Sequence, residues 1–261
     1  MINFHIPDFT QKLSFNLDVI QNKENLRSNV KIASVYDSFP NVIFNGGRCR
    51  LGPTFSINLI ENIVSTLNNL GVSLRYTFTN EFITEKYLGD YLSNVCLEIA
   101  HNELNGVIVN NDVIENYVRK NFPKYKIISS TTSRKTTRED IIERLNGYDS
   151  VVLPIHLNKN FEFLSSLPNK EKIEIIINEN CPGLCPQRKA CWTNESKAQI
   201  MYDPNFLLNC RSLDSDKQKD TYMSFDELEK LNEIGINNFK IQGRRDPVEN
   251  LRRYYDDFIF K

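Results

Sequence analysis

Three cysteines, Cys181, Cys185 and Cys191, lie within eleven residues of this sequence. Two prolines and a glycine interrupt the segment, so we expect an irregular loop there rather than a regular helix or strand. Such a loop can turn several thiolates towards one centre, and thiolates are preferred ligands of iron–sulfur clusters and of structural zinc. Cys210 or Cys49 would supply a fourth ligand. The segment therefore predicts a metal centre of one of these two kinds.

Other interpretations of the cysteines stay open. The Cys-x-x-Cys pairs typical of zinc ribbons are missing, as is the Cys-x-x-x-Cys-x-x-Cys spacing associated with radical S-adenosylmethionine enzymes. The pattern is also compatible with cysteines that bind nothing, or with a disulfide in an oxidising compartment. Cys96, the remaining cysteine, lies in an apolar pattern with helical spacing, which indicates a small core residue.

Charged residues near the cysteines suggest a site for a ligand. Glu179 is a candidate acid, base or anchor. Arg188 and Arg244 would make the site positive, which suits a phosphate- or carboxylate-bearing molecule. His156 stands at the end of an expected strand and is a candidate ligand contact. For each of these residues the alternative is an ordinary role, in a salt bridge or at the rim of the fold.

The composition is that of an ordinary globular protein, with 40% hydrophobic and 25% charged residues. The 32 basic and 33 acidic residues leave a net charge of −1, which does not suggest a basic surface for nucleic acid. No run approaches the roughly 18 apolar residues of a membrane span, and residues 1–11 lack the pattern of a signal peptide. We therefore expect a cytoplasmic protein that makes no use of a membrane.

Short apolar runs alternate with helix-like segments along the chain, which favours parallel strands joined by helices. Strands are expected at residues 30–35, 72–77, 106–109, 126–130, 150–153, 172–177 and 238–241. Helices are expected at about residues 56–70, 86–104, 112–122, 137–145, 224–234 and 247–258. This gives seven clear units, and residues 198–208 are the candidate for an eighth.

The unit count and the length of 261 residues favour a single α/β domain that spans residues 1–261. We expect it to be a TIM-like (β/α) barrel with an irregular or incomplete seventh or eighth unit. The glycine patterns of dinucleotide and P-loop sites are missing, which argues against a Rossmann or NTPase fold. In a parallel barrel the site lies where the strands end. Several charged residues follow expected strands, and we expect them there with the cysteines: Arg48, Arg50, His156, Glu179 and Arg244.

Two motifs resemble the peptidase U32 family. Residues 177–188, Ile-Asn-Glu-Asn-Cys-Pro-Gly-Leu-Cys-Pro-Gln-Arg, resemble the family's Val-Asn-Glu-x-Cys…Cys-Pro-x-Arg segment. Residues 239–244, Phe-Lys-Ile-Gln-Gly-Arg, resemble its late Phe-Lys-Ile-Glu-Gly-Arg segment. The order and separation of the two motifs fit the family, and the resemblance spans about residues 30–245.

The resemblance implies a TIM-like barrel. In the family branch associated with hydroxylation of tRNA, rRNA or ubiquinone precursors, it also implies a [4Fe–4S] cluster on four cysteines. Cys181 and Cys185 match family cysteines, and in one branch a ligand comes from the loop that here holds Cys49. The chain departs from the family at Gln242, where members often carry Glu, and near Cys191, where they carry His. It lacks the usual peptidase signature, so protease activity is not expected.

The leading hypothesis is a U32-like barrel that holds an iron–sulfur cluster on its cysteines and acts in hydroxylation-type modification of a small molecule or RNA. The residues expected to face the substrate are Glu179, Arg188, Arg244 and His156. One alternative is a hydrolase or lyase that uses no metal or contains zinc. Another is a non-catalytic subunit that binds a partner protein.

Overall fold

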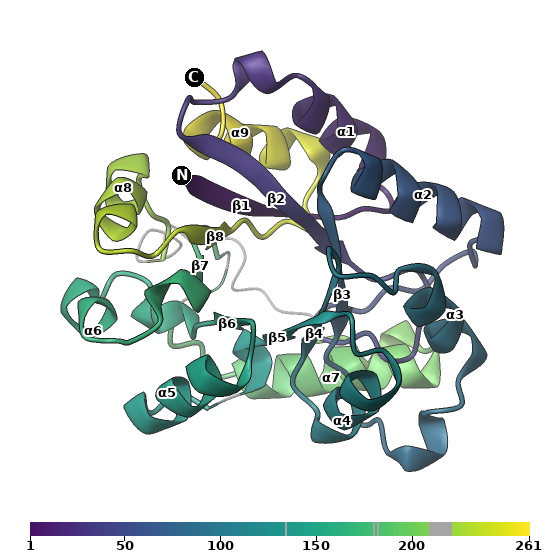
Figure 1. Ribbon diagram of the computed structural model, residues 1–261. Coiled ribbons are helices and arrows are strands. Elements are labelled where there is room, and N and C mark those ends of the chain that lie inside the picture. The colour runs from purple at the N-terminus through teal and green to yellow at the C-terminus, as the bar shows by residue number, and fades with distance from the viewer. Residues whose placement is uncertain (134, 180, 182, 209–220) are drawn as a thin grey trace.

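Eight parallel strands close into a barrel surrounded by helices in the computed structural model of the protein (Figure 1). The structure describes residues 1–133, 135–179, 181, 183–208 and 221–261. The strands are β1 (Ile2–Pro7), β2 (Val30–Asp37), β3 (Ser73–Phe78), β4 (Gly106–Val109), β5 (Lys126–Ser129), β6 (Ser150–Val152), β7 (Ile173–Ile176) and β8 (Asn238–Lys240). Strand order around the barrel follows the chain, and β1 closes it by pairing with both β2 and β8. The expected TIM-like α/β barrel is confirmed.

Helices follow the strands and cover the outside of the barrel (Figure 1). They are α1 (Leu13–Gln21), α2 (Ile57–Asn69), α3 (Tyr91–Ile99), α4 (Asp112–Asn121), α5 (Arg138–Gly147), α6 (Phe161–Ser165), α7 (Arg188–Met201), α8 (Phe225–Glu233) and α9 (Val248–Phe258). Asn111 caps α4, and Thr137 and Ser224 form capping boxes that open α5 and α8. Among the residues that the structure describes, no helix combines the length and apolar character needed to cross a membrane.

The strands are covered on both faces, as expected for a parallel sheet. Every residue of β4 and of β7 is buried. The main apolar core lies between the strands and the surrounding helices. A smaller apolar cluster lies within the barrel towards its mouth, and its members are Tyr36, Ile108, Ile128, Val152, Ile155 and Ile176.

One expectation about the barrel units is wrong, and one strand is missing from the sequence prediction. Residues 198–208 hold no strand in this structure, because they form the end of α7 and the 3-10 helix η6 (Pro204–Phe206). The unit that completes the barrel is instead the N-terminal strand β1, which the sequence does not predict. Its polar residue His5 hides the strand pattern, since a histidine usually lies near water, whereas here the side chain is only 1% exposed.

A long connection between β7 and α8 holds both the cysteine segment and α7. Cys191 and Trp192 lie in the first turns of α7, so the expectation of an irregular loop is wrong from Arg188 onwards. The physical reason is that the glycine and the second proline, Gly183 and Pro186, precede the helix and do not interrupt it. This connection therefore places a helix, and not only a loop, at the mouth of the barrel.

Candidate functional site

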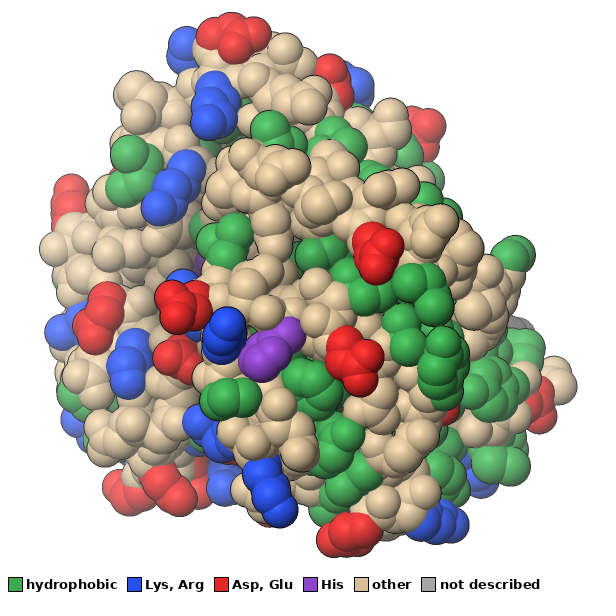
Figure 2. All heavy atoms as spheres, turned by 45° about the vertical axis from the view of Figure 1, so that its right-hand side comes forward, with side chains coloured by type: hydrophobic (Ala, Val, Ile, Leu, Met, Phe, Trp, Pro, Cys, Tyr) green, Lys and Arg blue, Asp and Glu red, His purple; other side chains and the backbone are tan. Residues whose placement is uncertain are grey.

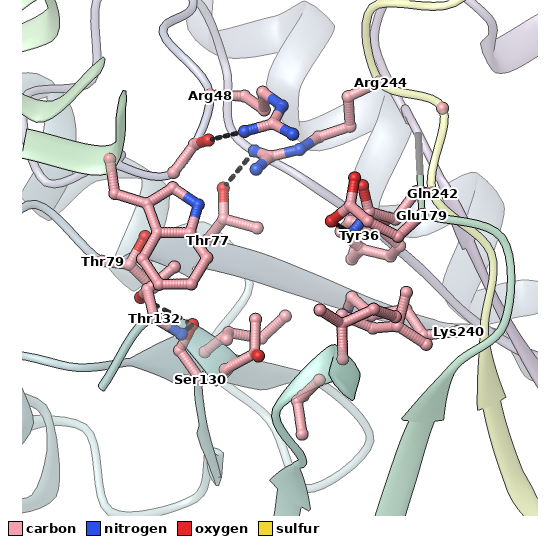
Figure 3. Close-up of a pocket in the computed structure, with 18 of the residues that line it drawn as sticks. Tyr36, Arg48, Thr77, Thr79, Ser130, Thr132, Glu179, Lys240, Gln242 and Arg244 are labelled. Carbon is pink, nitrogen blue, oxygen red and sulfur yellow. Dashed lines mark hydrogen bonds between the residues drawn. The ribbon is translucent and has the colours of Figure 1, made fainter. Parts of the chain in front are cut away.

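A pocket opens at the carboxyl ends of the strands, inside the mouth of the barrel (Figure 3). Its volume is about 100 Å³, enough for several water molecules or one small ligand. Segments within or just after β2 to β8 contribute to it. Its polar lining includes Arg48, Thr77, Thr79, Ser130, Thr131, Thr132, Glu179, Arg188, Lys240, Gln242 and Arg244. This is the end of a parallel barrel where catalytic and binding residues gather.

Two arginines lie together at one side of the pocket (Figure 3). Arg244 follows β8, and its Nη1 donates to Thr77 Oγ1 at 2.9 Å. Arg48 comes from the loop after β2, and its Nη1 donates to the main-chain oxygen of Gly47 at 2.8 Å. A Cβ atom on Gly47 would lie 3.6 Å from Arg244 Nη2, so the two arginine-bearing segments touch. Their guanidinium groups concentrate positive charge beside the pocket hydroxyls.

A buried ion-pair network positions Arg244. Asp37 Oδ1 lies 3.5 Å from Arg244 Nη1, and Asp37 Oδ2 lies 2.6 Å from Arg50 Nη2. Arg50 also pairs with Asp8 at 2.8 Å. Burial lowers the pKa of Arg244 and raises the pKa of Asp37, while the attraction between opposite charges opposes both shifts. Arg50 therefore serves this network beneath the mouth, and Arg244 is the arginine that the network presents to the pocket.

Glu179 lines the same pocket and is held by three donors. Its Oε2 accepts from Gln242 Nε2 at 2.8 Å and from Arg188 Nη1 at 3.2 Å. Its Oε1 accepts from the main-chain N–H of Cys181 at 3.2 Å. Arg188 is the first residue of α7, and its guanidinium carbon lies 5.7 Å from the Trp192 ring centroid. The structure thus brings Glu179, Arg188 and Arg244 to one pocket, as the sequence predicts.

The floor of the pocket is polar on one side and apolar on the other. Lys240 Nζ lies 3.7 Å from the centroid of the Tyr36 ring, and the Tyr36 hydroxyl donates to the main-chain oxygen of Ile241 at 2.8 Å. The apolar lining consists of Ile108, Val152, Ile155 and Ile176. A ligand with one charged end and one apolar end would match this division.

A polar layer fills the barrel beneath the pocket. Glu174 accepts from Arg75 Nη1 at 2.7 Å and from Lys240 Nζ at 2.9 Å. His5 Nε2 lies 3.6 Å from Glu174, and His5 Nδ1 lies 2.7 Å from Ser34 Oγ. Burial lowers the pKa of His5 to about 3, so this histidine is neutral at pH 7. Among these side chains one carboxylate faces two cations, which leaves positive charge below the pocket.

The described cysteines do not form a closed set of metal ligands. Over the described parts of the chain, no three or more His, Cys, Asp or Glu side chains are grouped to hold a metal ion. Cys49, Cys181, Cys185 and Cys191 are each half-buried, and none forms a disulfide. Cys210 lies outside the described residues. The described thiols therefore do not fit a [4Fe–4S] or zinc centre by themselves, and the metal centre stays a prediction.

The surroundings of two of these cysteines favour the protonated thiol. Burial raises the pKa of Cys181 to about 11, and the Glu179 carboxylate adds to this rise. Burial also raises the pKa of Cys49 to about 11, together with the Glu195 carboxylate. In the absence of a metal, both thiols are therefore protonated at pH 7.

His156 lies in a neighbouring pocket and not in the main one. This second pocket also contacts Cys185 and Lys189, and it shares Arg188 and Trp192 with the first. Burial lowers the pKa of His156, and the charge of Arg188 lowers it further. His156 therefore lines a pocket next to the main one, and its surroundings favour the neutral imidazole.

Sequence reasoning misses Tyr36, Thr77 and Lys240, which line the main pocket. These residues lie within strands, whereas site residues of a parallel barrel are expected after each strand ends. A signal is present in β8, where the neighbours of Lys240 are apolar. Phe239 and Ile241 are fully buried, and alternation of side chains along a strand then directs Lys240 to the opposite face, the barrel interior.

Comparison with known proteins gives a structural match. The sequence matches no protein-family model and no curated protein. Among solved structures, the chain is similar to the U32 peptidase Mk0906, with a TM-score of 0.59 and 13% identity over 95% of each chain. The spore cortex-lytic enzyme SleL of Bacillus cereus gives a TM-score of 0.45 and 11% identity, over 98% of this chain and 74% of that one. The chain therefore has a U32-like α/β barrel fold.

Proposed function

We propose that this protein is an enzyme that binds a small molecule carrying a carboxylate or phosphate group in the pocket at the barrel mouth. The observation that carries this proposal is the pair of guanidinium groups, Arg48 and Arg244, beside pocket-lining hydroxyls. Planar guanidinium groups suit carboxylate and phosphate oxygens, and hydroxyls add further donors. Lys240 contributes positive charge from the floor. Glu179, fixed by Arg188 and Gln242, would act as the base opposite the anion site.

A small ligand fits the observations better than RNA does. The pocket is small, and the chain has a net charge of −1. On the face drawn in Figure 2, basic and acidic side chains are interspersed. Binding of an RNA backbone depends on a concentration of lysines and arginines that neutralises several phosphates. Positive charge gathered within the mouth instead suits one anionic group.

Isothermal titration calorimetry with inorganic phosphate, malonate and pyruvate tests the proposal. At least one of these anions should bind the wild type. Arg244→Gln should weaken that binding at least tenfold, because a hydrogen bond to a charged group contributes about 1.5–3 kcal/mol. Arg252→Gln, at an exposed position of α9, is the matched control and should leave affinity unchanged. Absence of binding by all three anions, or equal binding by Arg244→Gln, would contradict the proposal.

The second candidate function is the one that the family resemblance implies, a cluster-dependent, hydroxylation-type modification of a small molecule or RNA. Its supporting observation is that several of the cysteines lie close enough to one another, or to Arg48, for their charges to interact. Cys185 is close enough to Cys181 to influence its pKa, and both Cys181 and Cys191 influence the pKa of Arg48. Anaerobic reconstitution with iron and sulfide, followed by metal analysis and an absorbance spectrum, tests it. Iron bound to the wild type and lost in Cys181→Ser supports this candidate, whereas a colourless, iron-free protein excludes it.

A further inference from the structure

Lys240 points into the barrel at the floor of the pocket (Figure 3). It is only 6% exposed. Lysines are almost never buried to this degree unless they are paired, because removing an ammonium group from water is costly. Here the pairing partner is Glu174, which the Nζ atom reaches at 2.9 Å. The other side of the Nζ atom meets the face of the Tyr36 ring.

The positive charge of Lys240 is only partly balanced by its partner. Glu174 also binds Arg75 at 2.7 Å, so one carboxylate is shared between two cations. Burial lowers the pKa of Lys240 to about 8, while the Glu174 carboxylate acts in the opposite direction. A substantial fraction of the side chain is therefore a neutral amine at mildly alkaline pH. A neutral amine in a desolvated pocket is a nucleophile towards carbonyl carbon.

The anion site and the amine lie over the same aromatic ring. The Arg244 guanidinium carbon is 5.8 Å from the Tyr36 ring centroid, and the Lys240 Nζ is 3.7 Å from it. The positive charge of Arg244 also influences the pKa of Lys240. Both side chains also line the same small pocket, so a molecule that fills it can contact Arg244 at one end and Lys240 at the other. The isoleucine side of the floor remains for an apolar substituent.

We propose that Lys240 is a catalytic amine that forms an imine with the carbonyl carbon of a 2-oxo carboxylate. The carboxylate of this ligand lies against Arg244 and Arg48, and its neighbouring carbonyl faces Lys240. A 2-oxo acid satisfies both groups with a very small molecule, in keeping with the size of the pocket. The inference rests on the proposed function, because it uses the same anion site.

The covalent step balances without an oxidant or reductant. The neutral Nζ attacks the carbonyl carbon, a C–N bond forms, and the carbonyl electron pair moves to the oxygen. The oxygen takes up a proton, while the nitrogen loses one, which gives a neutral carbinolamine. Protonation of the hydroxyl and loss of water then break the C–O bond, and the nitrogen lone pair forms the iminium. The products are one iminium and one water molecule.

Reductive trapping tests the inference. The wild-type protein is incubated with pyruvate and sodium cyanoborohydride, and its peptides are mapped by mass spectrometry. The peptide that contains Lys240 should gain the mass of pyruvic acid less one oxygen atom. Its modification should exceed that of exposed Lys230 at least tenfold and should increase as the pH rises through about 8. Lys240→Arg keeps a cation beside Glu174 and should abolish this adduct.

The outcomes separate this inference from the proposed function. Pyruvate that binds by calorimetry but leaves no adduct on Lys240 overturns the inference and leaves the anion site standing. Adducts confined to surface lysines, or unchanged total labelling of folded Lys240→Arg, also overturn it. If Lys240→Arg does not fold, the position and pH dependence of the wild-type adduct decide. If none of the tested anions binds, the proposed function itself is overturned.

Discussion

His5 is a buried side chain inside the barrel, and its surroundings hold it neutral. It faces Ser34 on one side and Glu174 on the other. Arg75 and Lys240 lie in the same layer, and both oppose protonation of the imidazole. Burial is the larger cause of its low pKa. Protonation of His5 would place a further positive charge in a layer that already has an excess.

The neutrality of His5 predicts acid sensitivity. Its pKa falls from 6.5 in the unfolded chain to about 3 in the folded protein. Below pH 6.5 the unfolded chain therefore binds a proton that the folded protein does not, and stability decreases as the pH falls towards 3. The expected contribution is about 1.4 kcal/mol per pH unit. Urea unfolding of wild type and His5→Gln across this range measures it. Equal pH dependence of the two proteins would contradict the assignment.

At the level of single residues, the sequence predicts pocket-lining residues better when they lie just after a strand than when they lie within one. Glu179, Arg188 and Arg244 are predictable because polar residues after parallel strands meet at one end of a barrel. Lys240 is harder to predict, because alternation along β8 directs it to the barrel interior whereas a lysine is almost never buried without a partner. The polar layer with Glu174 that accepts it is made from strands far apart in sequence, and no local pattern reveals it.

At the scale of elements, α7 is fastened over the mouth by buried side chains. Gln199 Oε1 accepts from the main-chain N–H of Arg50 at 2.6 Å, and its Nε2 donates to the main-chain oxygens of Val42 and Arg50 at 3.0 and 3.1 Å. The Glu195 carboxylate accepts hydrogen bonds from both terminal nitrogens of Arg245, each at 2.6 Å. The Gln199 contacts join α7 to the loop that carries Arg48, and the Glu195 contacts join it to the segment after β8.

Gln199→Ala should loosen this attachment without harming the helix itself, since alanine is the best helix former. The substitution leaves several buried main-chain groups without their partner, at about 1–3 kcal/mol for each unsatisfied group. We expect lower stability in urea and faster amide exchange over residues 42–50. Met201→Ala, at an exposed position of the same helix, is the matched control. Equal exchange in the two variants would show that Gln199 does not hold α7.

Gly46 allows the loop after β2 to approach the end of β3. A Cβ atom at this position would lie 2.5 Å from the main-chain carbon and oxygen of Thr79, closer than two such atoms can pack. Gly46→Ala should therefore displace the loop and Arg48, lowering the stability by about 1–3 kcal/mol and weakening anion binding. Gly89→Ala, where a Cβ meets nothing within 4 Å, should change neither property in thermal unfolding and calorimetry.

Most elements are predictable because their local signals agree with their environment. The helices α2 and α8 show apolar spacing and capping residues, and the strand β4 is a continuous apolar run. The strand β1 and the start of α7 are not predicted, for opposite reasons. In β1, polar residues that face the barrel interior interrupt the apolar pattern of a strand. Before α7, nearby prolines suggest an irregular segment, but that segment ends where the helix begins.

At the scale of the whole molecule, the barrel has no free edge between its first and last strands. Residues Asn3, Phe4 and His5 of β1 pair with β8, and β1 pairs with β2 along its whole length. The N-terminal strand thus joins the two ends of the chain's sheet. Since each strand depends on both neighbours, partial loss of the barrel would expose two sheet edges.

This closure predicts that the chain unfolds as one unit, in agreement with the expected single domain over residues 1–261. Trp192 is the only tryptophan and reports on the mouth of the barrel, while far-ultraviolet circular dichroism reports on the helices. Their urea transitions should coincide, as for a cooperative transition. Separate midpoints would show that the mouth, with α7, unfolds independently of the barrel.

The mouth of this barrel is proposed to bind an oxyanion between Arg48 and Arg244. A crystal soaked in selenate tests it most directly, because the selenium atom is located by its anomalous scattering. We predict a peak inside the pocket, with selenate oxygens at hydrogen-bond distance from both guanidinium groups, and loss of this peak in Arg244→Gln. Selenate found only on the outer surface, with the pocket holding water alone, would contradict the claim.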